Sequence, residues 1–165
     1  MRYECDLKDI EFVDCEEKDI EALLNLIYKI AEYEKMTDQV IATKESLYES
    51  IFVKDRARVI LVKKENNIIG YMLYFFNYST FIGDANLYLE DLFILEEYRH
   101  NGIGKRLFKL LANIAVENNC KRIDWVCLDW NKPSLDFYKS INAQALDFWV
   151  LHRLEGKDII TLANS

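Results

Sequence analysis

The chain has 165 residues and a net charge of −7; 51% of its residues are hydrophobic and 13% aromatic, with five glycines and one proline. This composition excludes a disordered chain and offers no linker, so residues 1–165 are expected to form a single domain. The longest apolar run, residues 68–76, is too short to cross a bilayer, and the N-terminus does not resemble a signal peptide. We therefore expect a cytoplasmic protein with no membrane contact.

In chain order, the hydrophobic pattern predicts alternating strands and helices. The expected strands are residues 9–15, 57–63, 68–78, 87–95, 122–128, 145–154 and 158–162, and the expected helices are residues 16–33, 43–52, 103–118 and 133–140. Asp14 and Glu17 resemble a capping box ahead of the first helix, and residues 65–67 are typical of a hairpin turn. This order predicts an α/β (α+β) fold with a mixed, partly parallel sheet covered by helices.

The charge is unevenly distributed along the chain. Residues 1–50 carry 14 acidic and 6 basic side chains, whereas residues 99–122 carry six basic side chains against one acidic. A basic segment in an acidic protein favours an anionic cofactor and a cationic second substrate, and it disfavours nucleic acid. Solvated surface charge explains much of the acidity equally well.

Cysteine and histidine spacing gives no sign of a metal site. The four cysteines show no C-x-x-C spacing, and both histidines stand alone. Reduced cysteines that act as small apolar residues are the expected state, and no metal is predicted.

The segment Arg99–Gly104, with the pattern R-x-x-G-x-G, lies between a predicted strand and a predicted helix. Backbone N–H groups that converge beside a helix N-terminus bind phosphate groups. The glycine spacing fits neither a dinucleotide fingerprint nor a Walker A loop. An ordinary glycine-containing turn is the alternative interpretation.

Two other short segments carry residues with useful chemistry. Glu90 and Asp91 are neighbours in an otherwise apolar strand, where they are expected to face opposite sides of the sheet. At least one of them is expected to be structural, while the other could accept a proton in a cleft. Further on, Asn131 can cap a helix that holds Pro133 in its first turn and also contains Tyr138. On composition alone, Tyr138 reads as a core or surface residue.

Taken together, these segments resemble the GNAT superfamily of acetyl-CoA-dependent N-acetyltransferases, and are most similar to its spermidine/spermine and thialysine acetyltransferase branch. The matching segments are residues 31–36, 39–41, 87–91, 98–99, 102–104 and 130–139. The resemblance implies a GNAT-type sheet of about seven strands, with a splayed fourth strand and about four flanking helices. It also implies that acetyl-CoA lies in the cleft that the splayed strand opens.

The resemblance also assigns residues to the cofactor. The backbone of the fourth strand would hold the pantetheine arm, the glycine segment would wrap the pyrophosphate, and the later helix would flank the thiol end. These groups are Leu92, Phe93 and Ile94; Arg99, His100, Asn101, Gly102, Ile103, Gly104 and Lys105; and Asn131, Pro133, Ser134 and Tyr138.

For the chemistry, the resemblance makes Tyr138 the general acid for the coenzyme A thiolate. Glu90 would take a proton from the incoming ammonium group, and Tyr33 and Glu34 would line the amine pocket. The implied reaction is direct attack by a primary amine of a small cationic acceptor in a ternary complex, catalysed by a homodimer.

The acceptor is less well defined than the donor. After residue 139 the chain departs from the polyamine enzymes, because residues 145–152 are mostly apolar where those enzymes carry an acidic, glycine-containing segment. A diamine, a polyamine and a thialysine-like amino acid remain comparable acceptors. The alternatives are a non-catalytic acetyl-CoA-binding or interaction module on the same fold, and a protein or peptide N-acetyltransferase.

Overall fold

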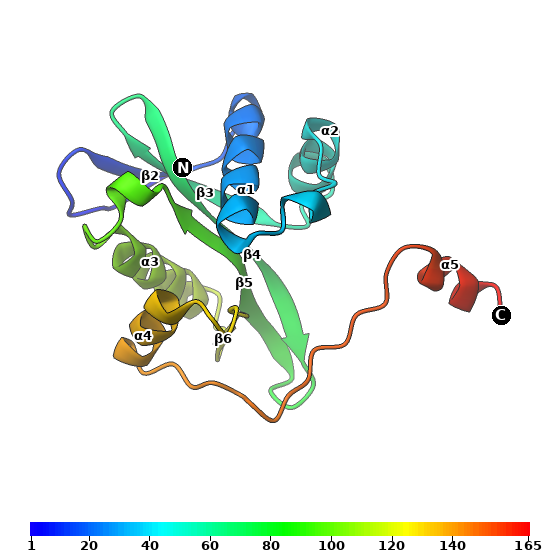
Figure 1. The fold of residues 1–165 in the computed structure, drawn as a ribbon. Coiled ribbons are helices and arrows are strands. Elements are labelled where there is room, and N and C mark those ends of the chain that lie inside the picture. Colours follow the sequence, from blue (N-terminus) through cyan, green and yellow to red (C-terminus); the bar gives the residue numbers. More distant parts are fainter. The chain divides into compact units, whose positions relative to one another are not determined.

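The computed structural model describes residues 1–165 and contains two compact units, residues 1–126 and residues 127–165. The first unit holds a mixed sheet and three α-helices, and the second holds two α-helices (Figure 1). This confirms the predicted α/β class. No helix is both long enough and apolar enough to cross a bilayer.

The sheet contains six strands, in the spatial order in which they occur along the chain. Adjacent strands are antiparallel except for the last pair, which is parallel. The strands are β1 (Arg2–Tyr3), β2 (Ile10–Asp14), β3 (Arg58–Lys64), β4 (Asn67–Ser79), β5 (Asp84–Ile94) and β6 (Ile123–Asp124). The mixed sheet was predicted, with six strands where about seven were expected. The two-residue β1 is too short to show a periodic pattern in the sequence.

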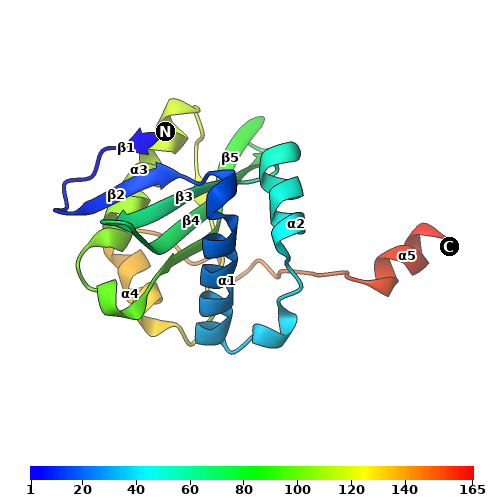
Figure 2. The same ribbon diagram turned by 90° about the horizontal axis from the view of Figure 1, so that it is seen from above.

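Three α-helices of the first unit cover the sheet. They are α1 (Ile20–Glu34), α2 (Lys44–Tyr48) and α3 (Ile103–Glu117). A 3-10 turn (Glu17–Asp19) precedes α1, a π-helical turn (Glu49–Val53) extends α2, and further 3-10 turns lie at Thr37–Gln39 and Glu96–Tyr98. The helices α1 and α2 lie on one face of the sheet and α3 on the other, as the two views show together (Figures 1 and 2).

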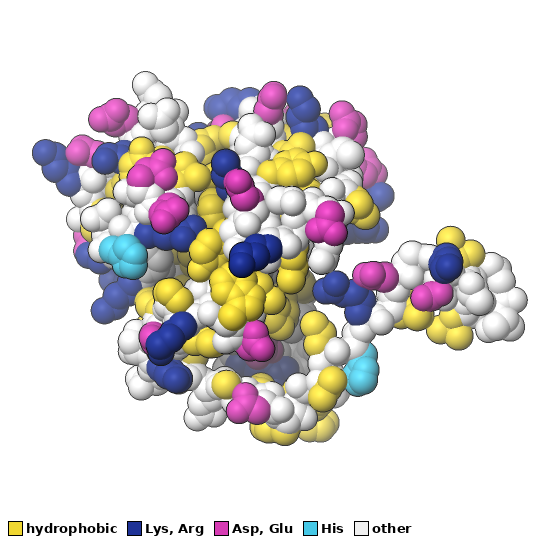
Figure 3. Space-filling model, viewed as in Figure 1, with side chains coloured by type: hydrophobic (Ala, Val, Ile, Leu, Met, Phe, Trp, Pro, Cys, Tyr) yellow, Lys and Arg dark blue, Asp and Glu magenta, His cyan; other side chains and the backbone are white.

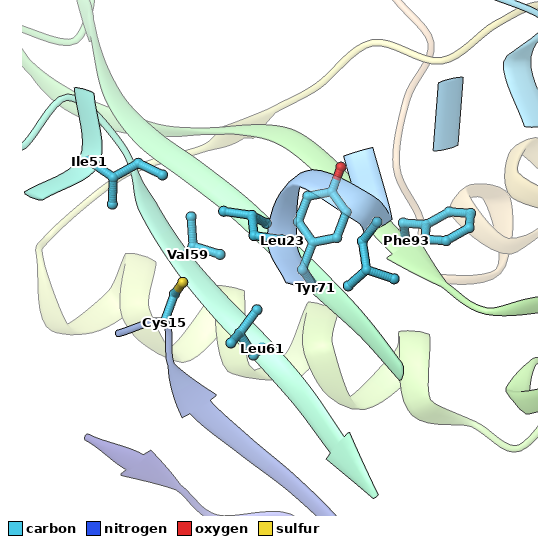
Figure 4. Close-up of a cluster of buried hydrophobic side chains, with 8 residues drawn as sticks. Cys15, Leu23, Ile51, Val59, Leu61, Tyr71 and Phe93 are labelled. Atoms are coloured by element: carbon cyan, nitrogen blue, oxygen red, sulfur yellow. The ribbon is translucent and has the colours of Figure 1, made fainter. Parts of the chain in front are cut away.

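The strand alternation divides the core between these two faces. On the α1 face, Leu23 packs with Val59 and Leu61 of β3, and with Tyr71 and Phe93 from the next two strands (Figure 4). The residues between them point to the α3 face, where the fully buried side chains are Phe12, Ile60, Val62, Met72, Leu87, Leu107 and Leu111. The two cores hold α1 and α3 against opposite faces of the same sheet.

The turns and caps follow the sequence in part. The hairpin turn between β3 and β4 is confirmed, and Glu65 adopts the left-handed conformation there with φ of 54°. The predicted capping box of Asp14 and Glu17 is wrong, because the reciprocal hydrogen bonds join Glu16 and Asp19 instead. Asp14 accepts a hydrogen bond from the Tyr3 hydroxyl and therefore belongs to the sheet edge.

A β-bulge interrupts β5 in its middle. Leu73 of β4 pairs with Asp91, but the next residue, Tyr74, pairs with Leu89. Glu90 is therefore the extra residue of β5, inserted between the two residues that pair with Leu73 and Tyr74. Counting β2 as the first long strand, β5 is the fourth, so the strand that was expected to be splayed carries a β-bulge.

The second unit contains α4 (Lys132–Ser140) and α5 (Lys157–Ala163). The α4 prediction is confirmed, but the predicted strands at residues 145–154 and 158–162 are wrong. Residues 145–154 pair with no strand, and residues 158–162 are helical after Gly156 at φ of 57°. A short apolar run cannot be assigned to strand or helix by its period alone. The prediction for residues 122–128 was also too long, since only β6 forms there.

Candidate active site

The segment between β5 and α3 contains two residues with a left-handed backbone. His100 has φ of 62° and Gly102, the N-cap of α3, has φ of 76°. Arg106 donates its N–H to the Gly102 carbonyl oxygen at 3.3 Å, and the N–H groups before it are those that a helix leaves unpaired. The Asn101 side chain donates to two carbonyl oxygens of the loop, at 3.2 and 3.3 Å, and so fixes its shape. Such a turn at a helix N-terminus suits a phosphate group.

Glycine is favoured at positions 102 and 104 of this loop for two different structural reasons. Gly102 needs its left-handed backbone, and a Cβ there would lie 2.5 Å from Nη1 of Arg106. A Cβ on Gly104 would meet no atom within 4 Å, so Gly104 leaves open space beside the first turn of α3. This open space lies next to the unpaired N–H groups and leaves room for a phosphate group.

An ion pair that sequence reasoning missed fixes the start of α3. The Arg106 guanidinium donates to both carboxylate oxygens of Asp6, with distances of 2.8 Å from Nε and 3.0 Å from Nη2. The two residues are 100 positions apart. Of the basic side chains in residues 99–122, Arg106 is therefore engaged within the protein.

Arg99 occupies a position between β5 and α1. Its Nε donates to the Ile94 carbonyl oxygen at 2.8 Å, and its guanidinium lies 4.8 Å from the centroid of the Tyr33 ring and 5.4 Å from that of Phe93. These contacts connect the end of the bulged strand with the last turn of α1. The predicted contact of Arg99 with pyrophosphate stays a prediction.

The bulge also decides where the two carboxylates of β5 lie. Asp91 accepts a hydrogen bond of 2.8 Å from the hydroxyl of Tyr71, which belongs to the core on the α1 face. Because Glu90 is the extra residue, the alternation is shifted, and Glu90 and Asp91 share that face. The expectation that they face opposite sides was wrong, because it assumed a regular strand.

A third carboxylate, that of Glu34, approaches from the end of α1. Burial raises the pKa of Glu34, and the charge of Asp91 raises it further. Burial also raises the pKa of Asp91, while the hydrogen bond from Tyr71 opposes that shift. The effect of Asp91 on Glu34 shows that the two carboxylates lie close enough to interact.

In the second unit, the predicted residues gather on one helix. Asn131 is the N-cap of α4, Pro133 and Ser134 lie in its first turn, and Tyr138 lies in its last turns beside Phe137, with ring centroids 5.8 Å apart. The N-cap position of Asn131 is confirmed, but its side chain makes no capping hydrogen bond.

Replacing Gly104 with alanine separates binding from folding. We expect the apo-protein to be stabilised by about 0.5 kcal/mol, because alanine favours a helix and meets no neighbour. The KM for acetyl-CoA should rise at least about tenfold, the equivalent of one lost charge-assisted hydrogen bond. Gly102→Ala is the matched control, because its positive φ should make it lose stability as well. Urea unfolding and initial rates measure both effects, and an unchanged KM in Gly104→Ala would place the pyrophosphate elsewhere.

A mixed sheet with a bulged strand that leads into a phosphate-type loop agrees with the GNAT fold expected from the sequence. A model of the acetyltransferase (GNAT) family matches residues 19–142, and the chain belongs to this family. It is an acetyltransferase on the GNAT fold.

Individual relatives agree with this family. The thialysine N-epsilon-acetyltransferase of Bos taurus is 36% identical over 162 residues, which cover 91% of this chain and 95% of that protein. The L-ornithine N5-acetyltransferase of Arabidopsis thaliana is 38% identical over 98 residues, covering 58% of this chain and 43% of that protein. An integron cassette protein from the mobile metagenome of V. cholerae has the same fold, with a TM-score of 0.80 and 26% identity over 96% of this chain and all of that one.

Proposed function

We propose that this protein transfers an acetyl group from acetyl-CoA to a primary amine of a small cationic acceptor. The observation that carries the proposal is the pair of interacting carboxylates, Glu34 and Asp91, beside the bulge of β5, where Tyr71 holds Asp91 by a hydrogen bond of 2.8 Å. A buried negative pair of this kind attracts an ammonium group. The phosphate-type loop begins where the same strand ends, so donor and acceptor would meet along β5.

The donor would be held by the backbone of Leu92, Phe93 and Ile94, by the loop of residues 99–105, and by Asn131, Pro133 and Ser134 of α4. Bound acetyl-CoA supplies the acetyl group. In this proposal the unpaired N–H groups at the start of α3 and the side chain of Lys105 neutralise the pyrophosphate.

The acceptor arrives charged and must lose a proton before it can attack, because an alkyl ammonium group has a pKa of about 10.4. We assign Glu90 to accept that proton, through a water molecule, and Tyr138 to hold the proton that goes to the coenzyme A sulfur. Tyr33 and Glu34, in the last turn of α1, would line the amine pocket.

We further propose direct transfer in a ternary complex, without an acetylated cysteine. Burial raises the pKa of Cys15 to about 12, so this thiol stays protonated and unreactive. Among acceptors, the names of the relatives favour the side-chain amine of a basic amino acid such as thialysine or ornithine, with diamines and polyamines as further candidates.

We also propose that residues 1–165 act as one catalytic domain and that two copies associate. The family match extends across the boundary between the two units, which supports the first point. The exposed apolar residues of the second unit support the second point; among them are Phe148, Trp149, Val150 and Leu151, and Ile159, Ile160 and Leu162 on α5. Figure 3 shows hydrophobic side chains on the surface of α5. The cytoplasmic location stays a prediction.

Acetyl transfer to a panel of amines tests the proposed function. We expect release of coenzyme A thiol with thialysine and ornithine, weaker release with spermidine, and none with a peptide of neutral side chains and a blocked N-terminus. Initial rates at varied concentrations of both substrates should give intersecting double-reciprocal lines, as direct transfer requires. Parallel lines would indicate an acetylated enzyme, and no turnover with any amine would contradict the function.

A further inference from the structure

We infer that Tyr71 is a positioning residue for the acceptor pocket: its buried hydroxyl holds the carboxylate of Asp91 on the α1 face of the bulge, in the form that receives the acceptor's ammonium group. This inference rests on the proposed function and adds a determinant on β4, a strand to which no functional residue had been assigned. Three features of the first unit support it: the hydrogen bond, the burial of Tyr71 and the register of β4 and β5.

The hydrogen bond is directional and sheltered from water. Tyr71 is fully buried, with an exposed fraction of 0%, and its hydroxyl lies 2.8 Å from Oδ2 of Asp91. A tyrosine hydroxyl at this distance donates to the ionised carboxylate. A buried carboxylate otherwise tends to take up a proton, and a protonated Asp91 would not attract a cation.

The register explains why one tyrosine can serve this purpose. Tyr71 pairs with Phe93 across the two strands, and Leu73 pairs with Asp91, so Tyr71 and Asp91 are diagonal neighbours on one face. Without the bulge at Glu90, the residues of β5 on one side of it would be turned to the opposite face. The register of the bulged strand places Asp91 on the α1 face, and the hydrogen bond from Tyr71 fixes the position of its carboxylate there.

The groups that face Asp91 are mostly acidic. Glu34 approaches from α1, Tyr71 from β4, and Glu90 precedes Asp91 on the same strand. The three carboxylates, those of Asp91, Glu34 and Glu90, all raise the pKa of the Tyr71 phenol. Arg99, which follows β5, is held against the rings of Tyr33 and Phe93. A cluster of carboxylates of this kind suits the ammonium group of the acceptor.

The inference predicts a pH effect in the variant Tyr71→Phe. Loss of the hydroxyl removes the interaction that lowers the pKa of Asp91, so the pKa of Asp91 should rise. The acid limb of kcat/KM for thialysine should then move to higher pH by about one unit, since a hydrogen bond to a charged group is worth about that much. Near pH 6, kcat/KM should fall about tenfold, whereas the KM for acetyl-CoA should not change.

Tyr74→Phe is the matched control. Tyr74 lies three residues further along β4, is nearly buried, and faces the opposite side of the sheet, so its variant also loses one sheltered hydroxyl. We expect its acid limb to coincide with that of the wild-type protein. A coinciding acid limb in Tyr71→Phe, or an equal shift in both variants, would overturn the inference.

Two further measurements keep the test decisive. If Tyr71→Phe does not fold, Asp91→Asn keeps the shape of the pair, and it should raise the KM for thialysine without changing that for acetyl-CoA. If the wild-type protein acetylates no amine, the proposed function fails, but calorimetric binding of thialysine near pH 6 still tests the pair. Equal affinity of the wild-type protein and Tyr71→Phe would overturn the role of Tyr71 there as well.

Discussion

The variant Tyr138→Phe should lower kcat by about 10²- to 10³-fold, while the KM for acetyl-CoA stays within about twofold of the wild-type value. A phenylalanine keeps the ring and its contact with Phe137 and removes only the proton donor. A general acid acts on the departing group, so its loss lowers the rate more than it weakens binding of the donor. Steady-state thiol release at saturating acetyl-CoA measures the effect.

The same variant also tests which group receives the proton of Tyr138. Acceptors of lower basicity should not restore kcat, because the missing proton belongs to the sulfur and not to the amine. Tyr78→Phe is a suitable control, since Tyr78 is an exposed tyrosine at the end of β4 and its hydroxyl has no role in the proposal. Full activity of Tyr138→Phe would remove Tyr138 from the mechanism and leave the fold and the family assignment untouched.

The parts of the fold that the sequence predicts well are those determined by local patterns. Apolar residues at helical spacing placed α1, α3 and α4 within a few residues of their observed bounds. The strands β2 to β5 follow from runs of β-branched and aromatic residues that are flanked by residues typical of turns. The glycine loop could also be located, because a left-handed N-cap and an open space beside a helix both favour glycine.

The predictions that were wrong or missing concern features that depend on residues far apart in the sequence. Residues 145–154 have the composition of a strand, but a strand forms only where a neighbour offers hydrogen bonds, and no strand pairs with them here. The pairing of Asp6 with Arg106 likewise joins residues that no local pattern relates. Most of all, the bulge at Glu90 is a property of the register between β4 and β5, which the alternation within β5 cannot reveal.

The register matters for function because it decides how many carboxylates share the α1 face. A regular strand would have left Glu90 and Asp91 on opposite faces, with one of them against the α3 core. The bulge places both on the face that Glu34 also reaches. In the proposed function, Glu90 would exchange protons with the acceptor, while Glu34 and Asp91 would provide the negative charge that attracts it.

This division of roles predicts a distinct pH dependence for Glu90→Gln. We expect kcat/KM for thialysine near pH 7 to fall about 10²-fold, because glutamine keeps the shape of the side chain but accepts no proton from the ammonium group. The deprotonated fraction of an amine with a pKa of about 10.4 rises tenfold with each pH unit below that value. The variant should therefore recover about tenfold per unit as the pH increases, whereas the wild-type protein levels off.

The same profile distinguishes Glu90 from its neighbours. Asp91→Asn should weaken attraction of the acceptor and show no such recovery, because raising the pH does not restore the missing negative charge. Glu117→Gln, at the end of α3, serves as a control for the loss of one carboxylate from the protein. A Glu90→Gln variant whose kcat/KM levels off at the same pH as that of the wild-type protein would show that another group accepts the proton, and Glu34 would then be the next carboxylate to test on this face.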